Sequence, residues 1–194
     1  FDDADIRRGK PTVHKAFGEP VAVLTGDALI IAAFEALGTM TLDSSTAQRL
    51  PRVMHIIARG TGAPYGICAG QAWESEHSVD LSLYHQAKTG ALFVAATTAG
   101  AAAAGVDASN WAGLGTSIGE AYQVADDIQD AISTPEALGK PCAQDVTLDR
   151  PSAVAELGVQ GAAQRLRELI ERGLDSVPPC HGRDKLLDLV RAQA

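Results

Sequence analysis

Three closely spaced aspartates carry the strongest chemical signal in the sequence. Asp126, Asp127 and Asp130 stand in GEAYQVADDIQDA, a segment that is otherwise mostly apolar. In a helix, Asp126 and Asp130 share one face, and Gln123 extends that polar face by one turn. Carboxylates this close repel one another and are costly to desolvate. A divalent cation removes this conflict, and hard oxygen ligands favour magnesium together with the phosphate oxygens of a substrate. The alternative is an acidic helix end near Ile132 that is exposed to water.

A second charged group opens the chain. The segment FDDADIRRGK places three acidic residues before three basic ones, namely Asp2, Asp3, Asp5, Arg7, Arg8 and Lys10. Asp2 and Asp5 can share a helix face, and paired guanidinium groups offer forked donors that suit phosphate oxygens. The alternative is a salt-bridged helix end without a ligand.

Two isolated lysines complete the set of candidate residues. Lys88 stands in YHQAKTGALF, in the middle of a predicted apolar helix, and Lys140 stands in LGKPCAQD, in a loop beyond the aspartates. A buried lysine needs an anionic partner. For Lys88, a diphosphate held by metal ions is one such partner, and Glu74 or a carboxylate within the helix is the alternative.

The composition bounds the class of protein. The chain has 194 residues, a formal net charge of -8, 46% hydrophobic residues and 5% aromatic residues. This size predicts one domain, 1–194, with an aliphatic core. The net negative charge argues against a nucleic acid or an anionic membrane surface as the main partner. The three widely spaced cysteines predict neither a disulfide framework nor a structural zinc site, and they favour the reducing cytoplasm.

Helices must position these residues, because strand signals are weak and no two-residue hairpin turn joins alternating apolar residues. The pattern predicts helices over residues 21–37, 44–59, 64–74, 80–105, 109–130 and 162–174, with a loop over 133–151. The capping candidates are Asp43, Ser44, Asp80 and Ser109.

Two of these apolar stretches resemble membrane spans, residues 21–37 and 90–106. Asp27 within the first stretch would cost about 2.5–3.5 kcal/mol at the bilayer centre. The second stretch consists mostly of the weakly apolar residues Ala and Gly. Both are therefore predicted to be buried helices of a bundle, and no transmembrane segment is expected.

Five segments of the chain resemble, in the same order, the motifs of the trans-isoprenyl diphosphate synthases. They are RRGKPTVHKAFGEPVAVLTGDAL, GICAGQAWE, YHQAKTGAL, YQVADDIQD and LGKPCAQD. Within that family, the likeness is greatest to the geranylgeranyl diphosphate synthases of purple photosynthetic bacteria. The resemblance implies an all-α bundle of the isoprenoid-synthase type around a central cavity. It also implies that the N-terminal helices and two aspartates of the family's DDxxxxD motif precede Phe1, so that this chain alone would be a poor catalyst.

The resemblance also implies roles for individual residues. The metal ligands would be Asp2, Asp126, Asp127 and Asp130. Arg7 would contact the allylic diphosphate, and Arg8 would contact the isopentenyl diphosphate. The allylic diphosphate or its metals would further be reached by Lys88, Thr89, Gln123 and Lys140. The residues that take part in catalysis would be Lys88, Gln123 and Asp126.

The reaction implied by the resemblance is the magnesium-dependent condensation of isopentenyl diphosphate with an allylic diphosphate. The implied product is geranylgeranyl diphosphate for carotenoid and bacteriochlorophyll synthesis, and a cytoplasmic homodimer is expected from the family. Three alternatives stay open, namely a farnesyl diphosphate synthase, a class I terpene cyclase and a non-catalytic subunit of a heteromeric synthase. The segment DDIQD favours chain elongation over cyclisation, and its intact aspartates argue against a non-catalytic subunit.

Overall fold

The fold is given by a computed structural model, which describes residues 3–40, 43–76, 83–84, 86–132 and 152–193. Two short strands, β1 (Ile6–Arg7) and β2 (Lys10–Pro11), precede the helices. The helices are α1 (Val13–Phe17), α2 (Glu19–Thr39), α3 (Ser44–Ala47), α4 (Leu50–Thr61), α5 (Ile67–Ala72), η1 (Trp73–Ser75), η2 (Gln86–Gly90), α7 (Ala91–Ala104), η3 (Ala108–Trp111), α8 (Ala112–Ile132), α11 (Ala153–Asp175) and α12 (Arg183–Gln193). The predicted all-α architecture is thereby confirmed. The predicted loop over 133–151 and the predicted cap Asp80 lie outside the described residues.

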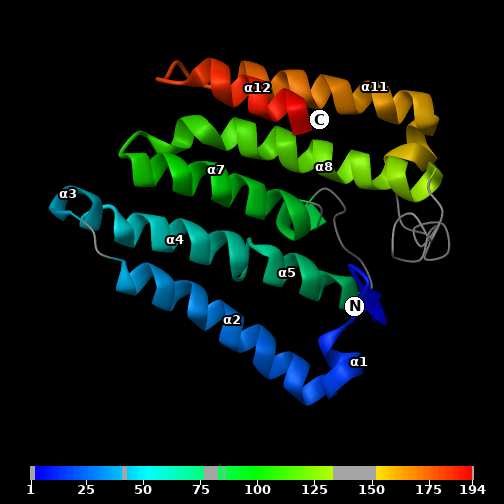
Figure 1. The fold of residues 1–194 in the computed structure, drawn as a ribbon. Coiled ribbons are helices and arrows are strands. Elements are labelled where there is room, and N and C mark those ends of the chain that lie inside the picture. The colour runs from blue at the N-terminus through cyan, green and yellow to red at the C-terminus, as the bar shows by residue number, and fades with distance from the viewer. Residues whose placement is uncertain (1–2, 41–42, 77–82, 85, 133–151, 194) are drawn as a thin grey trace.

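The long helices form one row in chain order (Figure 1). Helix α2 contacts α4, α4 contacts α7, α7 contacts α8, and α8 contacts α11, beside which α12 lies. Helices α7 and α8 run antiparallel, because Gly115 lies against Val94 and Gly119 lies against Gly90. The end of α8 therefore lies at the same end of the bundle as the start of α7.

The core consists mostly of small aliphatic side chains, as the composition predicts. Between α8 and α11, the buried residues are Ala121, Val124, Ala162 and Leu169. A second cluster joins α8 to the C-terminal segment, and a third, made of Ala101, Ala102 and Ala108, packs against α4 and Trp111. Small side chains let helix axes approach closely. The row of helices is therefore held by close packing of α4, α7, α8 and α11.

A β-hairpin lies at the start of the chain, where the charge pattern predicts a helix face or a salt-bridged helix end. Strand β1 pairs antiparallel with β2, in the register Ile6 with Pro11 and Arg7 with Lys10. The turn residues Arg8 and Gly9 both have positive φ angles, 52° and 73°. Positive φ at both central residues is the geometry that two-residue hairpins favour. The sequence does not reveal this hairpin because strands of two residues are too short to show an alternating pattern.

Helix α2 contradicts the prediction that residues 21–37 are buried. No residue of α2 is buried, and Leu24 and Ile31 are 67% and 66% exposed. The helix is apolar on all sides, which is typical of a buried helix. The sequence does not indicate which other surface buries it. Within the described residues, α2 is also the one helix whose length and composition would allow it to cross a membrane. The other apolar stretch is buried only on one side, since α7 buries Ala95, Thr98 and two further residues while Leu92 and Val106 are exposed.

Two helix starts test the predicted caps. The Asp43 carboxylate accepts hydrogen bonds from the backbone N–H groups of Ser45 and Thr46, at 2.9 and 3.0 Å, which confirms Asp43 as a cap. Hydrogen bonds from the Ser45 and Thr46 side chains also hold the pKa of Asp43 well below its usual value. The prediction for Ser109 is wrong, because Asp107 caps this turn by accepting from the Ser109 N–H at 3.0 Å. Asp107 and Asp43 thus cap in the same way, each accepting a hydrogen bond from the N–H group two residues later.

The glycine at position 115 permits the contact between α7 and α8. A Cβ atom on Gly115 would lie 2.5 Å from the Val94 Cα atom and 2.7 Å from the Phe93 carbonyl oxygen. Both neighbours are backbone atoms, so the helices would have to move apart. We expect Gly115→Ala to lower the free energy of unfolding by about 1–3 kcal/mol, as overpacking does. Denaturant titration of the intact protein measures this change.

Gly100 provides the matched control for this substitution. It is an exposed helical glycine in α7, and a Cβ atom placed on it would meet nothing within 4 Å. Gly100→Ala should therefore raise the free energy of unfolding by about 0.5–1 kcal/mol, because alanine favours the helix. Equal effects of the two substitutions would show that the α7–α8 contact does not require glycine.

Candidate active site

Several of the predicted site residues meet where η2, the last three turns of α8 and the start of α11 lie together. The Thr89 hydroxyl donates a hydrogen bond to the Gln123 Oε1 atom at 3.3 Å. The Gln123 Nε2 group in turn donates to the Asp127 Oδ1 atom at 3.0 Å. Thr89, Gln123 and Asp127 are therefore linked in one chain of hydrogen bonds, although the first two are 34 residues apart in sequence.

Lys88 precedes Thr89 in η2, a single π-helical segment. Its ammonium group donates to the Tyr84 hydroxyl at 2.8 Å and lies 5.3 Å from the centre of the Tyr84 ring. Such π-helical turns are frequent at functional sites. Tyr84 carries no chemical signal of its own in the sequence, although its position four residues before Lys88 places it on the same helical face. The Lys88 side chain is half-buried, so its charge is only partly solvated.

Glycines on two neighbouring helices set the position of η2. A Cβ atom on Gly70 in α5 would collide with the backbone of Lys88, 2.6 Å from its Cα atom. On the opposite side, a Cβ atom on Gly119 in α8 would lie 3.0 Å from the Gly90 Cα atom. The backbone around Lys88 and Thr89 is therefore held between α5 and α8, and any larger residue at position 70 would displace Lys88.

The three aspartates of α8 have different surroundings. Asp127 is 6% exposed, whereas Asp126 and Asp130 are half-buried. The Asp127 Oδ2 atom accepts a hydrogen bond at 2.7 Å from the N–H group of Ala153, the first residue of α11. Asp130 stands in the last turn of α8, which contains no basic residue. The negative end of a helix dipole disfavours a carboxylate there, so a cation beside Asp130 would be stabilising.

The donor set of α8 fits a magnesium ion that is shared with a ligand. Magnesium accepts one or two carboxylates and completes its octahedron with water and phosphate oxygens. The Asp126 and Asp130 carboxylates supply hard oxygen atoms on one face of the helix. Within the described residues, no group of three acidic, histidine or cysteine side chains forms a closed metal site. The predicted ligand Asp2 and the predicted diphosphate contact Lys140 lie outside the described residues.

The charged residues at the start of the chain are partly paired with one another. Lys15 lies 3.4 Å from the Asp3 carboxylate and 3.0 Å from that of Asp5, and the His14 Nε2 atom lies 3.0 Å from Asp3. The Lys15 charge holds the pKa of Asp3 below its usual value, and the hydrogen bond to Asp5 raises the pKa of Lys15. Lys15 was not among the predicted site residues, because its distance along the chain from Asp3 and Asp5 gives no signal of contact.

Arg7 and Arg8 belong to the hairpin that precedes α1. Both are exposed residues of the hairpin, Arg7 in β1 and Arg8 in its turn. The left-handed backbone conformation of Arg8 sends the chain directly back into β2. Figure 1 shows this hairpin at the same end of the bundle as the end of α8.

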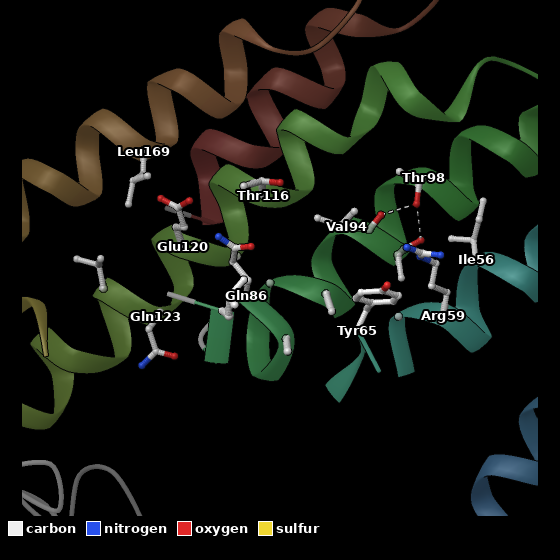
Figure 2. Close-up of a pocket in the computed structure, with 18 of the residues that line it drawn as sticks. Ile56, Arg59, Tyr65, Gln86, Val94, Thr98, Thr116, Glu120, Gln123 and Leu169 are labelled. Atoms are coloured by element: carbon white, nitrogen blue, oxygen red, sulfur yellow. Dashed lines mark hydrogen bonds between the residues drawn. The ribbon is translucent and has the colours of Figure 1, made fainter. Parts of the chain in front are cut away.

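A cavity of about 1140 Å³ extends from this polar end between α4, α7, α8 and α11. Figure 2 shows Gln123 and Glu120 toward one end, and Tyr65, Arg59 and Ile56 toward the other. The walls between them carry many small or apolar residues, among them Ala91, Val94, Ala95 and Leu169. Such a cavity can hold a long apolar group whose polar head lies near Gln123.

Two polar pairs in this cavity were not found from the sequence. Arg165 of α11 lies 3.3 Å from the Glu120 carboxylate of α8. The Arg59 guanidinium group lies 4.5 Å from the centre of the Tyr65 ring. The periodicity of α11 places Arg165 on the outer, wet side of the helix, but the structure turns it toward α8. Contacts of this kind depend on how helices pack, which a single sequence does not state.

A family model described as Polyprenyl synthetase matches residues 1–180. The geranylgeranyl diphosphate synthase of Cereibacter sphaeroides is 54% identical over the whole chain, which covers 67% of that protein. The geranylgeranyl diphosphate synthase of Rhodobacter capsulatus is 50% identical over the whole chain, which covers 66% of it. The farnesyl diphosphate synthase of Haemophilus influenzae is 38% identical over 91% of the chain and 63% of its own length. The chain thus spans about two thirds of the length of these relatives.

Solved structures show the same arrangement of helices. A geranyltransferase from Helicobacter pylori, complexed with magnesium and isoprenyl diphosphate, superposes with a TM-score of 0.81 at 27% identity, over 99% of this chain and 66% of that one. An FPP/GFPP synthase from Zymomonas mobilis superposes with a TM-score of 0.78 at 29% identity, over 100% of this chain and 68% of that one.

Proposed function

Because the chain belongs to the polyprenyl synthetase family, we propose that the intact protein is a magnesium-dependent prenyltransferase that condenses isopentenyl diphosphate with an allylic diphosphate. The proposed product is geranylgeranyl diphosphate. The two relatives that are 54% and 50% identical carry that name, whereas the farnesyl diphosphate synthase of Haemophilus influenzae is 38% identical.

The observation that carries this proposal is that a cluster of polar side chains lies next to a largely apolar cavity. Hydrogen bonds join Thr89, Gln123 and Asp127, and a largely apolar cavity of about 1140 Å³, lined by Gln123 and Asp127, leads away from them. An allylic diphosphate has the same division, with a charged head and a hydrocarbon tail. The polar end suits the head, and the cavity suits the growing tail.

The reaction breaks the bond between carbon and oxygen in the allylic diphosphate, and the electron pair leaves with the diphosphate. The double bond of isopentenyl diphosphate then forms a new carbon–carbon bond with the allylic cation, and a proton is lost. Bound magnesium would neutralise charge on the leaving diphosphate. Asp126 and Asp130 would hold that ion, and the Lys88 ammonium group would stabilise the charge that grows as the bond breaks. The apolar wall near Val94 would keep water from the cation.

An incubation of the intact protein with isopentenyl diphosphate, farnesyl diphosphate and magnesium tests this function. We expect a diphosphate that is one isoprene unit longer than farnesyl diphosphate, identified by mass spectrometry after phosphatase treatment. A cyclic hydrocarbon would instead identify a terpene cyclase. If no allylic diphosphate gave a product, the protein would be a non-catalytic subunit. A protein that extends geranyl but not farnesyl diphosphate would be a farnesyl diphosphate synthase.

The proposed location is the cytoplasm. Cys68 and Cys180 are free thiols, exposed and unpaired within the described residues, as is usual for proteins of a reducing compartment. A secreted protein would be expected to pair such exposed thiols.

We further propose that the protein is a homodimer in which α2 forms part of the interface. Leu24 and Ile31 are seven residues apart, on one face of α2, and are 67% and 66% exposed. Large exposed apolar surfaces of this kind mark interaction sites. A second copy of the chain would cover the face with the same apolar residues, as in other twofold interfaces.

Substituting α2 tests this dimer. Leu24→Glu combined with Ile31→Glu should convert the intact protein from dimer to monomer, because two buried, unpaired charges would face each other across the interface. Light scattering coupled to size exclusion measures the molar mass. Leu189→Glu on α12, where leucine is 59% exposed, is the matched control and should leave the dimer intact. A monomeric unsubstituted protein, or a dimer that survives both α2 substitutions, would contradict the proposal.

A further inference from the structure

Burial separates Asp127 from the aspartates beside it. Asp127 is 6% exposed and is the one buried charged side chain among the described residues, whereas Asp126 and Asp130 are half-buried. Magnesium dehydrates reluctantly and usually keeps several water molecules, so its ligands need open space beside the carboxylate. Asp127 lacks that space. A carboxylate in its position must be satisfied by donors from the protein itself.

The structure supplies those donors from two elements. The Asp127 Oδ2 atom accepts from the N–H group of Ala153 at 2.7 Å, and the Oδ1 atom accepts from the Gln123 Nε2 group at 3.0 Å. Ala153 begins α11, and the Ser152 hydroxyl accepts from the N–H group of Ala155 at 3.1 Å. Asp127 and Ser152 thus satisfy two N–H groups that the first turn of α11 leaves without a helical partner. The negative charge of Asp127 also complements the positive end of the α11 dipole.

Asp127 further sets the direction of the hydrogen bonds that lead toward Lys88. An ionised carboxylate only accepts, so Gln123 must turn its NH₂ group toward Asp127. The Gln123 carbonyl oxygen then faces Thr89, whose hydroxyl donates to it at 3.3 Å. A neutral amide at position 127 would place two donors opposite each other unless the Gln123 amide turned over.

We infer that Asp127 is a positioning residue and not a metal ligand: it ties α8 to the start of α11 and orients Gln123 and, through it, Thr89. Asp126 and Asp130 are then the two aspartates of α8 that we assign to the ion. The kinetic consequence rests on the proposed prenyl transfer, whereas the tie between α8 and α11 does not depend on it.

Metal-free measurements on the intact protein test the tie. In EDTA, Asp127→Ala should lower the melting temperature by about 3 °C or more and speed hydrogen exchange in the first turn of α11, over residues 153–156. Asp130→Ala removes a carboxylate one turn later and should leave exchange at these amides unchanged. Should Asp127→Ala not fold, Asp127→Asn keeps the shape of the side chain and should still speed this exchange, because its hydrogen bond carries no charge. Exchange and melting that match Asp130→Ala would overturn the inference.

Magnesium titration of activity separates positioning from metal binding. Asp127→Asn should lower kcat about tenfold while the half-saturating magnesium concentration changes by no more than about twofold. Asp126→Asn should raise that concentration about tenfold or more. Ser152→Ala weakens the same helix start without touching Gln123, and it should leave kcat within about twofold.

Two kinetic results would overturn the inference. One is a magnesium requirement raised by Asp127→Asn as much as by Asp126→Asn, which would make Asp127 a ligand. The other is a loss of kcat in Ser152→Ala as large as that in Asp127→Asn. Such a result would mean that Asp127 acts on kcat only by stabilising the start of α11. An unsubstituted protein without prenyl transfer would contradict the proposed function alone, and the exchange experiment in EDTA would still decide the tie.

Discussion

Replacing Asp126 by alanine is expected to lower kcat for prenyl transfer about a thousandfold while the helical fold remains intact. Asp126 is half-buried and follows one turn after Gln123, which accepts a hydrogen bond from Thr89 of η2. In the proposed reaction, its carboxylate holds the magnesium that neutralises the departing diphosphate. Without that charge balance, the bond between carbon and oxygen breaks only at a much higher free energy. Steady-state kinetics at saturating magnesium measure the loss.

A matched control separates this effect from damage to α8. Gln129 is an exposed residue of the same helix, and Gln129→Ala should leave kcat unchanged. Circular dichroism should show the same helix content for both variants. If Asp126→Ala retained its full turnover, the assignment of the α8 aspartates to the metal would be wrong.

The second large effect is expected at Lys88. Lys88→Ala should lower kcat/KM for the allylic diphosphate about a hundredfold, because a partly buried cation that contacts phosphate oxygens makes charge-assisted hydrogen bonds. Lys88→Arg should rescue little of this loss. The backbone of Lys88 lies against Gly70, and the longer, planar guanidinium group does not occupy the place of an ammonium group.

Two further variants sharpen the test of Lys88. Tyr84→Phe removes the hydroxyl group that accepts from Lys88 at 2.8 Å, and it should cost about tenfold or less in kcat/KM. Lys185→Ala removes an exposed lysine of α12 and should have no effect. Equal losses for Lys88→Ala and Tyr84→Phe would mean that Lys88 acts only by holding Tyr84.

Much of the site follows from local spacing. The interval between Asp126 and Asp130 places both on one face of a helix, and α8 realises that face. The family resemblance implied that Thr89 and Gln123 reach the same diphosphate, and a hydrogen bond joins these two residues in the structure. Spacing along the chain did not predict contacts between residues of different elements. The pairing of Lys15 with Asp3 and Asp5 arises because the hairpin reverses the chain and brings the residues after β2 beside those before β1.

The amino-acid sequence alone determined that the chain is helical, which residues carry charge within apolar segments, and which family it belongs to. These properties depend on residue type and on intervals of three or four positions. The tertiary structure decided that Asp127 lies against α11 while its neighbours stay half-exposed, and that α2 lies uncovered by the described chain. The physical reason is that burial and hydrogen bonding depend on which helix packs beside a residue. Adjacent aspartates in one helix point in different directions, and only the position of α11 distinguishes the buried one.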